Sequence, residues 1–119
     1  MSNVRRRMQS IAPARVLFKV DVRRKSELLE VLSQQHQKRK LLGELWYSLS
    51  IDDSARHVGY VALEWESFES ARRFFDSMES HGLVAEWPVV AVLEVVVLRD
   101  LTEEYAAYRN AKQSPESPT

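Results

Sequence analysis

Apolar and polar residues alternate along three stretches of the chain, and this two-residue period is typical of half-buried β-strands. The alternation runs through residues 14–22, 44–51 and 57–65. Residues 89–98 are apolar at every position except Glu94 and predict a fourth strand. The chain therefore carries four candidate strands, of which the last differs in being apolar on both faces.

Two segments between these strands show the 3.6-residue period of helices. In residues 26–42, Ser26 is expected to cap the helix, acidic residues occupy the first turn, basic residues occupy the last, and Gly43 follows at the C-cap. A second helix is expected over residues 68–81, starting after Ser67 and ending at Gly82. Their apolar stripe comprises Phe68, Ala71, Phe74, Phe75 and Met78. A short third helix is expected over residues 101–111.

This βαββαβ order predicts an α+β, ferredoxin-like fold, in which an antiparallel four-stranded sheet carries two helices on one face. The short C-terminal helix follows the last strand, and the expected strand order is 4-1-3-2. The domain spans residues 14–111. Residues 1–13 are expected to form a flexible N-terminal tail, and residues 112–119, which lack an apolar anchor, a disordered C-terminal tail.

In this topology the strand at residues 89–98 lies at the edge of the sheet, where an exposed apolar strand promotes aggregation. Strict alternation puts Val89, Ala91, Leu93, Val95 and Val97 on one face and Val90, Val92, Val96 and Leu98 on the other. The helix-free sheet face also carries Leu17, Trp46, Val58, Tyr60 and Ala62. We therefore expect a homodimer formed through the helix-free face and strand 89–98.

The segment from Gly59 to Phe75 has a strand that ends in Trp65-Glu66-Ser67 and leads at once into a helix. This segment and the order of elements resemble the dimeric α/β-barrel superfamily. The superfamily includes antibiotic-biosynthesis-type monooxygenases, heme-degrading monooxygenases, muconolactone isomerases and uncharacterised members. The resemblance covers roughly residues 14–100 and implies a dimeric α/β barrel.

The same resemblance argues against heme degradation. Heme-degrading members use an asparagine in the first strand, a tryptophan at the end of the third and a histidine about ten residues later. Trp65 matches the tryptophan, but Asp21 stands in the first strand and Phe75 at the histidine position. No cofactor is therefore expected.

The amino-acid composition further limits the classes of partner that the protein is expected to bind. The 119 residues include 17 basic and 17 acidic side chains, and this balance argues against nucleic-acid binding through the overall field. The sequence has no cysteine, and its three histidines are not clustered, so no metal site is expected. No secretory signal or stretch long enough to span a membrane is visible, which predicts a cytoplasmic protein.

The first predicted helix supplies the candidate chemistry, because the face that is apolar in its first half becomes polar in its second. We interpret that half as one wall of a cleft between this helix and the sheet, since superfamily members bind ligands there. The polar wall is formed by Gln35, His36 and Arg39, and the apolar wall by Phe18, Tyr47, Leu63, Trp65 and Phe75. In the alternative interpretation, the helix projects past the sheet and these polar groups lie in solvent. Trp65 likewise has an alternative role as a core residue.

Three functions remain open. The first is a homodimer that binds a small apolar or aromatic molecule between the first helix and the sheet. The second is a cofactor-independent monooxygenase or isomerase, in which Trp65 and Phe75 hold a planar substrate. His36 would then act as general base, and Arg39 would stabilise an enolate or oxyanion. The third is a protein-interaction module with no ligand pocket.

Overall fold

The computed structural model describes residues 12–113, so residues 1–11 of the predicted N-terminal tail and residues 114–119 of the predicted C-terminal tail lie outside it. The elements in chain order are β1 (Ala14–Asp21), α2 (Lys25–Leu41), β2 (Glu44–Asp52), β3 (Ala55–Trp65), α3 (Phe68–Asp76), α4 (Met78–Ala85), β4 (Ala91–Arg99) and α5 (Thr102–Gln113). All neighbouring strands are antiparallel, in the order β2-β3-β1-β4. The ferredoxin-like fold and its strand order are therefore confirmed.

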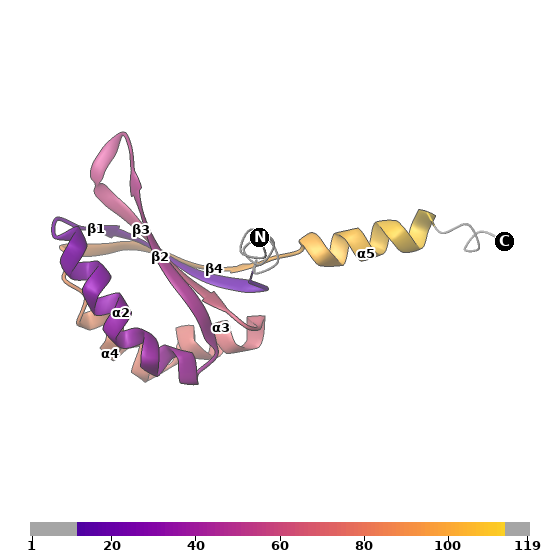
Figure 1. The fold of residues 1–119 in the computed structure, drawn as a ribbon, viewed down its shortest axis with the longest axis horizontal. Helices are drawn as coiled ribbons and strands as arrows, with labels where there is room; N and C mark the ends of the chain where they lie inside the picture. The colour runs from indigo at the N-terminus through magenta and orange to yellow at the C-terminus, as the bar shows by residue number, and fades with distance from the viewer. Residues whose placement is uncertain (1–11, 114–119) are drawn as a thin grey trace, which may run out of the picture.

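The core lies between the sheet and helices α2, α3 and α4, which cover the same sheet face (Figure 1). Alternate residues of β1 face these helices, so that Val16 and Val20 are fully buried. Leu28 and Leu32 of α2 are also fully buried against this layer. None of the described helices is long and apolar enough to cross a membrane.

The second predicted helix is in fact two helices, α3 and α4, separated at Ser77. Ser77 has an extended backbone, with φ −86° and ψ 149°, and its hydroxyl accepts a hydrogen bond from the Ser80 N–H at 2.9 Å. Ser67 caps α3 in the same way, as predicted. The expectation that Gly82 ends the helix is wrong, because Gly82 lies inside α4.

The ends of α2 also differ in detail from the prediction. Arg24 occupies the N-cap position without a side-chain cap, so Ser26 is not the cap residue. Arg24 instead pairs with Glu27 at 2.9 Å in the first turn. At the other end, the C-cap is Leu42, and Gly43 follows with a φ of 115°, a conformation that favours glycine.

Strand β4 contains a register shift that changes which of its residues face the helices. Glu94 is paired with Lys19, but Val92 is paired with Val20, so Leu93 is an extra residue in β4. Because of this bulge, Val92 and Val95 lie on the same sheet face. The strict alternation expected for residues 89–98 is therefore wrong across Leu93.

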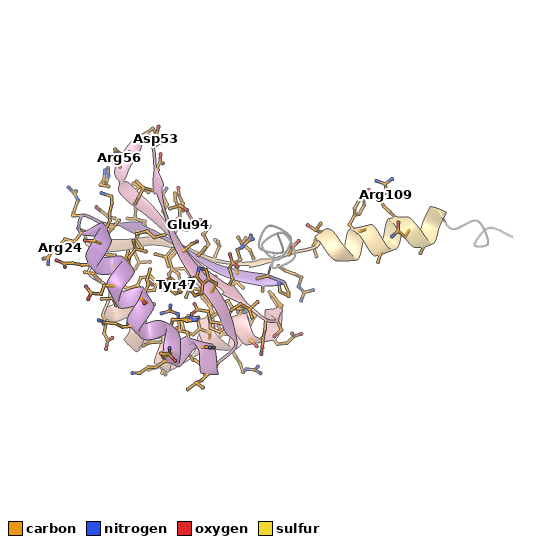
Figure 2. All side chains as sticks on the ribbon, in the orientation of Figure 1. Arg24, Tyr47, Asp53, Arg56, Glu94 and Arg109 are labelled. Carbon is orange, nitrogen blue, oxygen red and sulfur yellow. The ribbon has the colours of Figure 1, made fainter. Side chains whose placement is uncertain are left out.

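Both β4 and α5 leave apolar surface uncovered. Leu93 and Leu98 of the edge strand are 51% and 42% exposed. The helix α5 continues from β4 and extends away from the rest of the fold (Figure 1). Its Tyr105 and the preceding Leu101 are exposed, and Figure 2 shows Arg109 well clear of the sheet.

Candidate functional site

The polar half of α2 is buried rather than solvent-exposed. Gln35 is 5% exposed and Arg39 is fully buried. The Arg39 guanidinium donates hydrogen bonds from Nε to Glu44 at 2.8 Å, from Nη1 to Gln35 at 3.2 Å and from Nη2 to the Leu32 carbonyl at 2.9 Å. The alternative in which these side chains lie in solvent is therefore wrong.

Gln35 connects α2 to the segment that leads into β4. Its Oε1 accepts hydrogen bonds from Arg39 and from Trp87 Nε1, the latter at 2.9 Å. Its Nε2 donates to the Leu83 carbonyl and to the Glu86 carboxylate. The Gln35 amide is thus fully paired, and it joins elements about fifty residues apart in the chain.

His36 forms the outer edge of this cluster. Its Nδ1 lies 2.6 Å from Glu44 Oε1, and its side chain is 14% exposed. The imidazole packs against Trp46 and Tyr47, with ring centroids 5.4 and 5.3 Å away. Of the two His36 ring nitrogens, only Nδ1 has a hydrogen-bond partner among the described residues. Nε2 is therefore available to a ligand or water.

Glu44 holds this cluster together, because its two carboxylate oxygens bind two different side chains. One oxygen bonds Arg39 and the other His36. Burial raises the pKa of Glu44 above its usual value of 4.5, and hydrogen bonds and charges from Arg39 and His36 offset part of this rise. A buried carboxylate with this much pairing fixes the start of β2 against α2.

Sequence reasoning missed Glu44, because this carboxylate partner of His36 comes from the following strand and not from the helix that carries His36. Glu44 is the first residue of β2 and follows the turn at Gly43. It lies opposite Trp65 in the sheet, at a position whose side chain faces the helices. The available signal was the position of Glu44, a charged residue at a core-facing strand position directly after the basic end of a helix.

A cavity lies beside β4, at the opposite edge of the sheet from the Arg39–Glu44 pair. It has a volume of about 590 Å³ and is bounded by β1, β4, α3 and α4. Its apolar wall comprises Phe18, Phe75, Val84, Ala85, Val92 and Val95. Three polar residues, Asp76, Ser80 and His81, complete the lining.

Two of the predicted ligand-binding residues, Phe18 and Phe75, line this cavity. The others lie elsewhere. Leu63 and Trp65 are fully buried in the core, where the Trp65 ring packs 4.8 Å from that of Phe74. Tyr47 packs against His36, and Gln35 and Arg39 belong to the closed polar cluster.

Two further findings concern residues that could carry chemistry. His81 is an exposed residue of α4 that lines the cavity. Trp65 Nε1 is the one buried side-chain nitrogen or oxygen without a hydrogen-bond partner in the described part of the chain. Within residues 12–113, no three His, Asp or Glu side chains come together as metal ligands would.

Comparison with known proteins identifies the fold. No protein-family model matches the sequence. No curated protein matches it either. Among solved structures, a candidate antibiotic biosynthesis monooxygenase from Bordetella bronchiseptica superposes with a TM-score of 0.55 at 16% identity, covering 73% of this chain and 95% of that one.

Two other solved structures give the same result. A candidate antibiotic biosynthesis monooxygenase from Caulobacter crescentus CB15 has a TM-score of 0.54 at 14% identity, covering 79% of this chain and 97% of that one. A conserved protein from Methanosarcina mazei Go1 has a TM-score of 0.52 at 19% identity, covering 79% and 98%. The chain therefore has the fold of antibiotic biosynthesis monooxygenase-like proteins, which confirms the resemblance at the level of the fold.

The buried ion pair generates a prediction about stability. Arg39→Met and Glu44→Leu should each lower the free energy of unfolding by about 3 kcal/mol, because each leaves a buried charge unpaired. The double variant should lose less than the two single losses added together, with a coupling of at least about 1.5 kcal/mol. Urea denaturation measures all three variants.

The exposed pair of Arg56 and Asp53, 3.6 Å apart, provides the control (Figure 2). The corresponding Arg56→Met and Asp53→Leu cycle should give a coupling close to zero, since exposed ion pairs contribute little. Additive losses at Arg39 and Glu44 would contradict the role given to their ion pair.

Proposed function

We propose that this protein is a homodimer that binds a small apolar or aromatic molecule in the cavity between α3, α4 and the β1–β4 edge of the sheet. The cavity itself carries this proposal. Its volume of about 590 Å³ falls within the range of small-molecule sites. Six apolar side chains surround three polar ones, a lining typical of such sites.

This location differs from the cleft predicted beside the first helix. There, the space next to α2 is filled by the hydrogen-bonded cluster around Arg39. Beside α4 the covering helix is short, and the outer wall is the edge strand β4. Several fold neighbours carry the name antibiotic biosynthesis monooxygenase, which also supports a small organic ligand.

A neutral fluorescent probe tests the cavity. N-phenyl-1-naphthylamine should bind the unaltered protein with an increase in fluorescence, because its two aromatic groups match the apolar lining. Ala85→Phe places a ring in the cavity and should weaken binding at least about tenfold by steric exclusion. Fluorescence titration gives both affinities, and circular dichroism verifies folding.

Gln37→Phe is the matched control, since it adds the same ring at an exposed position of α2. Its affinity for the probe should equal that of the unaltered protein. Unchanged affinity in Ala85→Phe would exclude this cavity as the site. A dimer that binds no probe would instead support an interaction module without a ligand pocket.

The homodimer is supported by the uncovered surfaces of the sheet. The edge strand β4 exposes Leu93 and Leu98, which a second copy would remove from water. The helix-free face carries both signs of charge: Lys19 lies opposite Glu94, and Arg15 lies 3.9 Å from Glu64. A face with such balanced charges can complement itself across a two-fold axis. The extended helix α5 supplies a further apolar surface for the second copy.

Light scattering coupled to gel filtration tests this assembly. The unaltered protein should have twice the mass of the 13.8 kDa chain at micromolar concentration. Leu98→Lys should produce a monomer, because it introduces an unpaired charge into the interface. Leu41→Lys, at a position 88% exposed on α2, should leave the dimer intact. A monomeric unaltered protein would contradict the proposal.

A second candidate is an enzyme that removes a proton from carbon, as an isomerase or cofactor-independent monooxygenase does. The observation that favours it is the geometry of His36, whose Nδ1 is held by Glu44 while Nε2 has no partner among the described residues. His36 would take the proton from a carbon next to a carbonyl group. An isomerase returns that proton to another atom of the substrate. A cofactor-independent monooxygenase lets the enolate of a CH₂ group react with O₂. The carbon loses both hydrogens and becomes a carbonyl, so that one oxygen atom enters the substrate, the other leaves as water, and the substrate itself supplies the electrons.

Deuterium exchange tests His36 without knowledge of the natural substrate. The unaltered protein in D₂O should accelerate exchange at the acidic carbon of α-tetralone, followed by NMR. His36→Gln should reduce the acceleration at least about a hundredfold, the lower range for loss of a general base. His57→Gln is the control and should exchange normally. A rate equal to that in buffer would remove this candidate for aryl ketones.

A further inference from the structure

We propose that the ligand of the cavity carries an anionic group, and that arginines in an adjoining groove bind it. The proposal rests on the function proposed above and specifies its ligand as an amphipathic anion. The groove runs between α3 and the end of β4 and has a volume of about 480 Å³. Its cationic residues are Arg72, Arg73 and Arg99.

Two of these arginines are available to an anion. Arg72 lies 3.4 Å from Asp76, a long ion pair at the surface. Arg73 and Arg99 have no carboxylate within ion-pair distance among the described side chains. Glu69 is the other acidic residue of the groove, so the groove retains one positive charge in excess.

The arginines are oriented by aromatic rings. The Arg99 guanidinium lies 4.2 Å from the centroid of the Phe68 ring, and Arg72 lies 5.2 Å from that of Phe75. A guanidinium that rests on an aromatic face keeps its N–H groups at its edge, where they can bind a carboxylate, sulfonate or phosphate through two hydrogen bonds. Such restraint also reduces the side-chain entropy lost when an anion binds.

The groove adjoins the cavity, so one molecule can occupy both. Asp76 lines both the cavity and the groove. Phe75, whose ring lies under the Arg72 guanidinium, forms part of the cavity wall. A ligand whose apolar part contacts Phe75 therefore has Arg72 at the mouth of its site. An anionic group that leaves the cavity by this route passes the Asp76 carboxylate, which is paired with Arg72, and then meets the excess positive charge of the groove.

Two probes with the same aromatic body separate the cavity from the groove. N-phenyl-1-naphthylamine is neutral, and 1-anilinonaphthalene-8-sulfonate adds one sulfonate. In Arg99→Gln, the affinity for the sulfonate probe should fall at least about tenfold, the lower range for one charge-assisted hydrogen bond. The affinity for the neutral probe should not change. Fluorescence titration of the full-length protein measures both.

Three further variants sharpen the test. Arg99→Lys keeps the charge but loses the planar guanidinium, and should give an intermediate affinity for the sulfonate probe. Glu69→Gln removes the opposing charge and should increase that affinity about twofold. Arg23→Gln changes an exposed arginine at the end of β1 and should affect neither probe.

The outcomes distinguish this inference from the proposed function. If Arg99→Gln lowers the affinity for the sulfonate probe and leaves that for the neutral probe unchanged, the result supports the anion site. Equal effects of Arg99→Gln on both probes, or no effect on either, overturn the anion site while cavity binding stands. If neither probe binds the unaltered protein, the proposed function itself fails, and the anion site fails with it.

Discussion

The buried ion pair between Arg39 and Glu44 constrains the rest of this fold. Both side chains are completely removed from water, which is unfavourable unless each charge finds its partner and its remaining hydrogen bonds. Arg39 meets this requirement through Glu44, Gln35 and the Leu32 carbonyl. Because Arg39, Gln35 and Leu32 belong to α2 and Glu44 belongs to β2, the ion pair fixes how α2 packs against the start of β2.

The same cluster reaches the cavity beside α4 through one hydrogen bond and one ring contact. Gln35 accepts a hydrogen bond from Trp87, and the Trp87 ring packs edge-on against Phe18, with centroids 4.8 Å apart. Phe18 in turn lines the cavity. The molecule therefore has a hydrogen-bonded polar cluster beside β2 and an apolar cavity beside β4, and the cluster reaches the cavity walls through Trp87 and through the Gln35 hydrogen bond to the Leu83 carbonyl of α4.

The sequence patterns predicted the elements and their order because hydrophobic periodicity is a local property. They did not predict the break at Ser77, since the apolar stripe of α3 continues to Met78, which the structure leaves 82% exposed. The bulge at Leu93 depends on pairing with β1, which no local pattern reports. The candidate site shows the same limit. Phe18 and Phe75 face the side that their periodicity indicates, whereas the partner of Arg39 comes from a strand across a turn.

The break between α3 and α4 has a consequence for how this fold can diversify. If α3 and α4 formed one continuous helix, a change in the size of the cavity beneath its second half would also shift its first half. With two short helices, each capped by its own serine, the cavity-lining side chains of α4 can change while α3 keeps Ala71 and Phe74 in the core. Selection can therefore alter Val84 and Ala85, which line the cavity, while the Leu83 carbonyl keeps its hydrogen bond to Gln35.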